Sequence, residues 1–127
     1  MFSYHRPAST EEALSILSRE PCVPLAGGTD FYPARVGKPI QENVMDLTGI
    51  GSLRGIEERA EGIWMGALTI WTDVMHADLP EAFQGLQQAS RTIGGVQNQN
   101  AGTLCGNLCN ASPAADSVPN LMALEAQ

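Results

Sequence analysis

Two glycine-centred stretches decide the fold: Pro24-Leu25-Ala26-Gly27-Gly28-Thr29-Asp30, and Asn100-Ala101-Gly102-Thr103-Leu104-Cys105-Gly106-Asn107-Leu108-Cys109-Asn110-Ala111-Ser112-Pro113-Ala114-Ala115-Asp116. Glycine lets the main chain approach a ligand closely and turn its N–H groups toward an anion. The threonine, asparagine and aspartate side chains beside these glycines add groups that can bond a sugar or polyol. Two such loops in one small domain indicate a dinucleotide held by its pyrophosphate.

The composition excludes several classes of protein. With 127 residues the chain is one modest domain or part of a larger one, and its 43% hydrophobic content argues against disorder. The net charge of −7 argues against nucleic-acid binding, which needs clustered lysines and arginines. No apolar run reaches the length of a membrane span, and the first residues lack the apolar region of a secretory signal, so we expect a cytoplasmic protein.

The ionisable residues offer no metal site or catalytic group. Cys22, Cys105 and Cys109 are too few for an iron–sulfur cluster, and we expect no disulfide in a cytoplasmic chain. The histidines His5 and His76 stand alone, without an acid or nucleophile at a telling spacing. Lys38 is the one lysine and the arginines are scattered, so backbone N–H groups and helix N-termini would have to hold a phosphate.

The first half of the sequence has the pattern of a β–α–β unit. Ser9 and Glu12 form a capping box that opens a helix, which Pro21 ends. Residues 22–26 are a short apolar run typical of a strand, and residues 43–47 predict a second strand. Thr29 or Asp30 would cap a short helix over 31–36. Glycines at 49, 51 and 55 miss the spacing of a dinucleotide-binding G-x-G-x-x-G motif, and no P-loop pattern occurs.

The second half has a mixed pattern. Residues 53–58 and 63–66 predict a hairpin, and Thr69 or Thr72 would cap a short helix through Met75. A longer helix would begin near Pro80 and end at Gly94-Gly95, and a last helix would cover 117–124 with Asp116 as its cap. The second glycine motif between them is poor in helix and strand formers, and we expect it and the polar run 97–100 to be loops.

The two motifs resemble those of the flavin-binding subunit of the molybdenum hydroxylases, the group that includes xanthine dehydrogenase and aerobic carbon monoxide dehydrogenase. That family carries Ala-Gly-Gly-Thr/His-Asp/Ser near its N-terminus, then Thr-Ile-Gly-Gly-Asn, then Asn-Ala-Ser-Pro-Ala-Ala-Asp. Here Cys105 stands where the first glycine of the second motif usually lies. The resemblance runs over nearly the whole chain and includes Gly66-Ala67-Leu68-Thr69.

The resemblance implies an α+β fold, namely a two-subdomain FAD-binding domain of the vanillyl-alcohol-oxidase or PCMH type, truncated before its last strands. Residues 1–52 would form a small FAD-binding subdomain and residues 53–127 an incomplete second one, and the family's C-terminal domain would be absent. No catalytic residue is implied in this chain. The implied FAD contacts are Leu25, Ala26, Gly27, Gly28, Thr29, Asp30, Thr103, Leu104, Gly106, Asn107 and Asp116.

The implied function is electron transfer. FAD in this chain would receive electrons from [2Fe–2S] clusters in a small partner subunit and pass them to NAD or another acceptor, while a large partner subunit holds molybdopterin. The isolated 127 residues would be inactive. Two alternatives stay open at this stage: a stand-alone flavin oxidase of the same broad fold, and an interaction or scaffold fragment that does not bind FAD.

Overall fold

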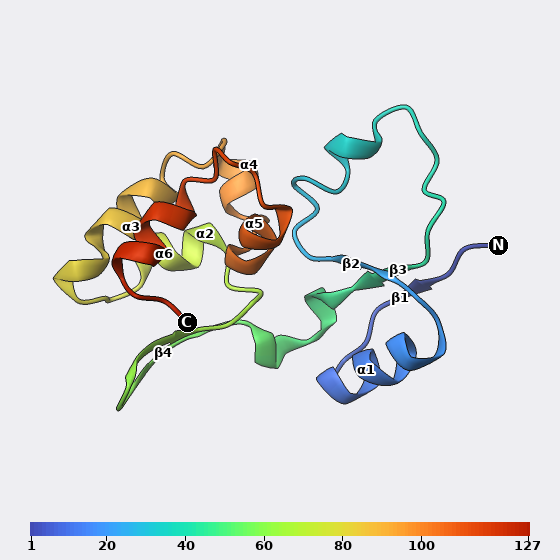
Figure 1. Ribbon diagram of the computed structural model, residues 1–127, viewed down its shortest axis with the longest axis horizontal. Helices are drawn as coiled ribbons and strands as arrows, with labels where there is room; N and C mark the ends of the chain where they lie inside the picture. The colour runs from blue at the N-terminus through green and yellow to red at the C-terminus, as the bar shows by residue number, and fades with distance from the viewer.

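The computed structural model describes all 127 residues and mixes helices with two small sheets. Figure 1 shows two masses joined by an extended connection: one holds the three-stranded sheet and the first helix, and the other holds the remaining helices above a hairpin. The elements in chain order are β1 (Tyr4–His5), α1 (Thr10–Arg19), β2 (Val23–Leu25), η1 (Pro33–Arg35), β3 (Val44–Asp46), η2 (Leu47–Gly49), η3 (Gly51–Leu53), β4 (Ile56–Arg59), β5 (Gly62–Met65), α2 (Trp71–His76), η4 (Glu81–Phe83), α3 (Gln84–Ser90), α4 (Val96–Gln99), α5 (Leu104–Asn110) and α6 (Ser117–Ala123).

The predicted β–α–β unit of the first half is present. Strands β1, β3 and β2 form a parallel sheet in that order, with β3 in the centre. The Ser9 hydroxyl caps α1 by accepting from the N–H of Glu12 at 3.1 Å, while the Glu12 carboxylate accepts from the N–H of Ala8 at 2.8 Å. Both halves of the capping box are therefore made, one residue displaced from the ideal pattern. The short strand β1 carries too few residues for a sequence pattern, and sequence analysis missed it.

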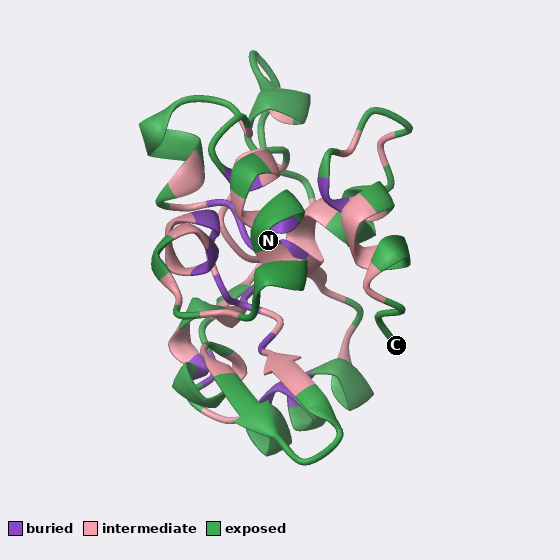
Figure 2. Ribbon diagram, turned by 90° about the vertical axis from the view of Figure 1, so that its left-hand side faces the viewer, coloured by how far each residue is buried: buried purple, intermediate pink, exposed green.

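Two separate hydrophobic clusters stabilise the molecule. Ala13 and Ile16 of α1 pack against Met45 of β3 in the first cluster, whereas Trp71 and Leu104 belong to the second. Figure 2 shows the buried residues as short segments among exposed ones. Each cluster forms where helices bury only their apolar side, so the rest of each helix stays exposed.

The connection between the clusters consists of η2 and η3. The boundary that sequence analysis expected, between residues 52 and 53, falls inside η3, and Leu53 packs on the first cluster. The hairpin β4–β5 follows as predicted, with Ile56 opposite Met65. No helix of the structure has both the length and the apolar character that a membrane crossing requires.

Several predicted element boundaries were wrong. Neither Thr69 nor Thr72 caps α2: Ile70 is the N-cap residue, and the Asp73 carboxylate accepts from its N–H at 3.3 Å. The Thr69 hydroxyl instead donates to the carbonyl of Gly55 at 3.0 Å, which ties α2 to the hairpin. The helix expected from Pro80 to Gly94 is divided into η4 and α3, and it ends at Ser90.

The second glycine motif and the polar run before it were expected to be loops, and both are largely helical. Val96–Gln99 form α4, and Leu104–Asn110 form α5. The Thr103 hydroxyl caps α5 by accepting from the N–H of Gly106 at 3.0 Å, and Leu104 is buried in the second cluster. Capping and burial of one anchor residue outweigh the poor helix propensity of glycine and asparagine.

Asp46, at the end of β3, fixes the start of the connection. Its Oδ1 accepts from the N–H and the hydroxyl of Thr48 at 2.9 and 2.6 Å, and its Oδ2 accepts from the Tyr4 hydroxyl and lies 3.4 Å from Nε of Arg6. Burial by itself would raise the pKa of Asp46, but the hydrogen bonds from Thr48 and Tyr4 outweigh it and the pKa is lowered. The ionised carboxylate therefore stabilises the fold.

Replacing Asp46 with asparagine tests this contribution. A carboxyl group with a lowered pKa stabilises the fold fully above its unfolded pKa of about 3.9 and loses that contribution as the pH falls through the folded value. We expect Asp46→Asn to lower the free energy of unfolding by about 1–2 kcal/mol at pH 7. The deficit should shrink progressively below about pH 4. Urea unfolding of both proteins at pH 7 and pH 3 measures the loss of unfolding free energy. An equal loss at the two pH values would contradict a stabilising role of the ionised Asp46 carboxylate.

Candidate functional site

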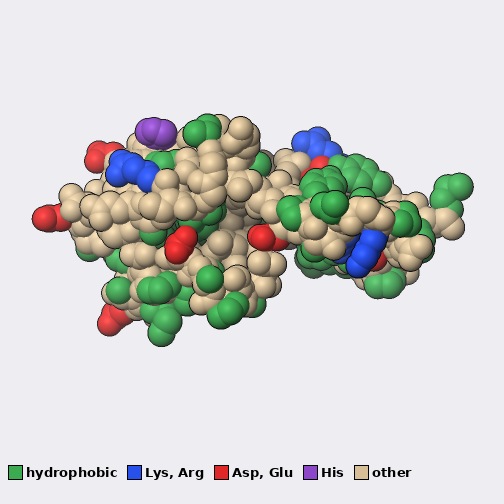
Figure 3. Space-filling view, turned by 90° about the horizontal axis from the view of Figure 1, so that it is seen from above, with side chains coloured by type: hydrophobic (Ala, Val, Ile, Leu, Met, Phe, Trp, Pro, Cys, Tyr) green, Lys and Arg blue, Asp and Glu red, His purple; other side chains and the backbone are tan.

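A cleft of about 540 Å³ lies between the two masses of the molecule and is lined by residues of both glycine motifs. The space-filling view shows the narrow waist between the masses (Figure 3). Its volume falls in the range of roughly 300–1,000 Å³ that is usual for ligand pockets. Ala26 follows β2 and Leu47 follows β3, so the carboxyl end of the parallel sheet faces the cleft, which is where open α/β sheets bind ligands.

The first loop carries free backbone donors. The N–H groups of Gly27, Gly28, Thr29 and Asp30 donate to no acceptor within the chain, although all four residues line the cleft. Gly28 has φ +74°, a left-handed conformation that glycine adopts without strain and that redirects the main chain inside the loop. Consecutive free N–H groups around such a turn form a cradle suited to an anion.

The second motif differs from the first, because the backbone N–H groups at the start of α5 already donate to acceptors within the chain. The N–H groups of Leu104 and Cys105 donate to the carbonyls of Thr69 and Ala67 at 2.9 and 3.4 Å, and those of Gly106 and Asn107 donate to the Thr103 side chain and carbonyl. The Asn107 side-chain oxygen accepts from the Ser117 hydroxyl, which leaves its NH₂ group as a donor for the cleft.

Backbone contact between the two motifs closes the cleft. A Cβ atom added at Gly27 would lie 1.9 Å from the Ala101 carbonyl oxygen, and one added at Gly102 would lie 3.3 Å from Oγ1 of Thr29. The absence of a side chain at Gly27 thus allows one loop to lie directly on the other. This contact joins parts of the chain that are otherwise connected through η2 and η3 (Figure 1).

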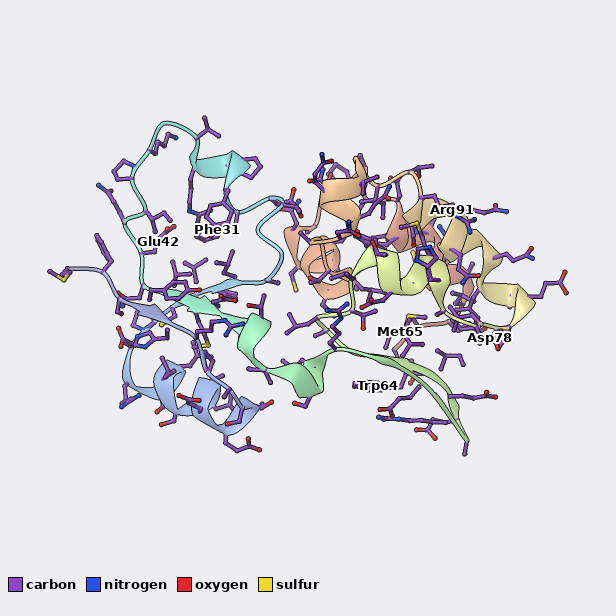
Figure 4. The ribbon with its side chains drawn as sticks, turned by 180° about the vertical axis from the view of Figure 1, so that it is seen from behind. Phe31, Glu42, Trp64, Met65, Asp78 and Arg91 are labelled. Carbon is purple, nitrogen blue, oxygen red and sulfur yellow. The ribbon has the colours of Figure 1, made fainter.

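The one arginine that lines the cleft is not free to bind an anion. Arg35 makes a two-pronged ion pair with Glu42, with distances of 3.2 and 2.8 Å, and its guanidinium lies 3.8 Å from the ring centre of Phe31. The hydrogen bond with Glu42 raises the pKa of Arg35 and lowers that of Glu42. Figure 4 shows Phe31 and Glu42 on the two arms of the loop that connects β2 to β3. Arg35 therefore stabilises this loop through its contacts with Glu42 and Phe31.

Most of the expected contact residues meet at this cleft. Eight of the eleven line it: Ala26, Gly27, Gly28, Thr29, Asp30, Thr103, Gly106 and Asn107. Leu25 and Leu104 are buried at 5% and 6% exposure and do not line it. Asp116 is exposed and lies outside the lining. The assignment of all eleven residues as cofactor contacts stays a prediction.

The capping bonds expected at both motifs are not made. Asp116 occupies the N-cap position of α6, but its side chain makes no capping bond, and its backbone is already helical with φ −68° and ψ −22°. Neither Thr29 nor Asp30 caps η1, whose N-cap residue is Tyr32. The carbonyl of Asp30 takes part instead, by accepting from the N–H of Ala34 at 3.2 Å.

Sequence reasoning missed part of the lining. Ala67 and Leu68 come from the segment between the motifs, and Trp71 contributes from the second cluster. Cys105 also lines the cleft from inside α5; its φ is not positive, so a side chain there causes no strain. Burial, and to a lesser extent Cys109, raise the pKa of the Cys105 thiol, so it stays protonated at neutral pH.

Comparison with known proteins identifies the fold and its relatives. The whole chain, residues 1–127, matches the family described as the FAD-binding domain in molybdopterin dehydrogenase. It is 36% identical over 130 residues to the glyceraldehyde dehydrogenase medium chain of Sulfolobus acidocaldarius, which covers 98% of this chain and 46% of the relative. It is also 36% identical to the carbon monoxide dehydrogenase medium chain of Afipia carboxidovorans, over 95% of this chain and 43% of the relative.

A solved structure agrees with these relatives. Reconstituted carbon monoxide dehydrogenase from Oligotropha carboxidovorans superimposes with a TM-score of 0.80 at 33% identity, over 92% of this chain and 42% of that one. The chain thus spans less than half the length of the relatives that it matches. The mixed helix-and-sheet fold is that of the FAD-binding subunits.

Gly27→Ala tests the backbone contact that closes the cleft. The added methyl group meets the main chain of Ala101, which no side-chain rotation relieves, so the two masses must move apart. We expect a cost of about 1–3 kcal/mol and a larger radius of gyration, with unchanged helix content. Small-angle scattering and circular dichroism measure these changes. Gly51→Ala is the matched control, because an added Cβ there meets nothing within 4 Å, and equal behaviour of the two variants would refute the contact.

Proposed function

The chain belongs to the family of FAD-binding domains of molybdopterin dehydrogenases, and we propose that it passes electrons from [2Fe–2S] clusters in a partner subunit through FAD to NAD or another acceptor. The observation that carries this proposal is the loop of four free N–H groups among the residues that line the cleft. The family supplies the identity of the cofactor, and the loop supplies the chemistry that fits its pyrophosphate.

The residues present fit an extended dinucleotide. The N–H groups of residues 27–30 would hold the pyrophosphate, and the Thr29 hydroxyl and the Asn107 amide would add donors from the two sides of the cleft. Asp30 repels phosphate and suits a hydroxyl or amide of the cofactor instead. Apolar lining residues such as Leu68 and Ile93 would exclude water from the remainder of the cleft.

The chain contributes binding and orientation, and the flavin supplies the redox chemistry when it is bound. We assign no acid or base catalyst to this chain. Of the ionisable side chains that line the cleft, the Cys105 thiol is protonated and the Arg35 guanidinium is paired with Glu42. The proposal includes a molybdopterin-binding large subunit, a small iron–sulfur subunit and a cytoplasmic location. It also includes the division into a first FAD-binding subdomain over 1–52 and a second over 53–127, of the PCMH type.

The relatives support the partners. Medium chains of a glyceraldehyde dehydrogenase and a carbon monoxide dehydrogenase are by name one chain among several. Within such an assembly the substrate would be oxidised at the molybdenum centre of the large subunit. The cleft described above therefore carries no information on the substrate of the whole enzyme.

Thr29→Val tests the proposed cradle. Oγ1 of Thr29 makes no hydrogen bond within the chain, so the near-isosteric valine removes one donor to the cofactor and disturbs little else. We expect FAD affinity to fall about tenfold, which corresponds to about 1.4 kcal/mol. Quenching of flavin fluorescence on titration measures the affinity. Thr10→Val, an exposed threonine of α1 far from the lining, is the control, and equal affinity in all three proteins would refute the cradle.

The same titration decides between the proposal and its rivals. A folded chain that does not bind added FAD would favour a scaffold role and reject the flavin function. Binding of FAD by the chain, together with molybdenum and iron that co-purify with it from its native source, would support the electron-transfer component. Binding of FAD without either metal in the native preparation would favour a stand-alone flavin oxidase.

A further inference from the structure

Three side chains that could bind a metal ion lie close together beside the parallel sheet, outside the lining of the cleft. His5 comes from β1, Glu20 ends α1, and Cys22 immediately precedes β2. Their ligand atoms all lie within 4.8 Å of one another, and each side chain is partly exposed. Sequence analysis treated His5 and Cys22 as unrelated, because the fold alone brings these three residues together.

The carboxylate of this cluster is held in place by its neighbours. Oε2 of Glu20 accepts from the Ser3 hydroxyl at 3.0 Å and from the Asn43 amide at 2.7 Å. Oε1 of Glu20 faces Nε2 of His5 at 3.0 Å. Polar groups that fix a ligand from behind are a common feature of metal sites, because they orient the ligand before the ion arrives.

We propose that His5, Glu20 and Cys22 bind one Zn²⁺ ion, with water as the fourth ligand. Imidazole nitrogen, carboxylate oxygen and thiolate sulfur are the three ligand types that zinc accepts in proteins. With bond lengths of about 2.0–2.3 Å, ligand atoms around a tetrahedral zinc lie about 3.3–3.8 Å apart, which small rotations of these side chains reach. Coordination releases the thiol proton to the solvent and replaces the contacts that Nε2 of His5 makes with Oε1 of Glu20 and with the Ser3 hydroxyl, at 3.0 and 3.1 Å.

The proposed ion would join three segments that otherwise meet through hydrogen bonds. It links the start of the chain, the end of α1 and the entry to β2, and Asn43 extends the network to the strand β3 between β1 and β2. A ligand that binds the folded state alone stabilises that state in proportion to the logarithm of its concentration. We therefore assign the site a structural role, separate from the residues that line the cleft.

The experiment is a zinc titration of the 127-residue chain in competition with a chromogenic chelator. We expect one equivalent to bind with a dissociation constant of about 1 μM or tighter, and Cys22→Ser and His5→Gln each to weaken it at least about tenfold. Cys109→Ser and His76→Gln are the matched controls. They remove the same groups outside the cluster and should change the affinity less than about twofold.

Cobalt gives an independent readout that needs no variant. Addition of Co²⁺ to the wild-type chain should produce a thiolate-to-cobalt charge-transfer band in the difference spectrum, and Zn²⁺ should abolish it. Circular dichroism checks that each variant is folded, and Glu20→Gln replaces any variant that is not. Absence of the band, a stoichiometry below one, or equal zinc affinity in the cluster and control variants would overturn the proposal.

Discussion

The contact of the Gly27 backbone with the carbonyl of Ala101 is the constraint on which the cleft depends. Each mass of the molecule has its own hydrophobic cluster, so burial of apolar surface does not by itself fix their separation. A distance set by two main chains is short and hard to vary, because backbone atoms have no rotamers to adjust. The loops that meet in this contact also line the cleft, so the same contact that joins the two masses shapes the cleft.

The two glycine motifs look alike in sequence but differ in how their backbone N–H groups are bonded. The first leaves consecutive N–H groups free around Gly28, whereas the second folds into α5 and uses its amides internally. An anion would consequently be held from one side by backbone dipoles, with Asn107 reaching from the other. This arrangement suits a chain of net charge −7 whose one cleft-lining arginine is paired with Glu42. Fixed dipoles bind a phosphate without the desolvation of a mobile cationic side chain.

Sequence reasoning succeeded where the signal was local and failed where tertiary contacts decided. The cap at Ser9, the turn at Gly28 and the hairpin β4–β5 follow from residues within a few positions of each other. The helix α5 could not be predicted from its composition, because burial of Leu104 in a cluster built by distant residues stabilises it. The lining residues Ala67 and Trp71 were missed for the same reason: only the folded chain brings the intervening segment to the cleft.

The small unit built on the parallel sheet supports two separate inferences. The carboxyl ends of β2 and β3 lead into the cleft, whereas His5 of β1, Glu20 after α1 and Cys22 before β2 form a cluster outside the lining of the cleft. Strands of three residues are too short to be stable by pairing alone, so side-chain bonds at both ends must hold them in register. Asp46 does this beside the cleft, and Glu20 does it at the other end. Side-chain bonds at both ends of β3 therefore hold the short strands in the register that places the first glycine loop beside the cleft.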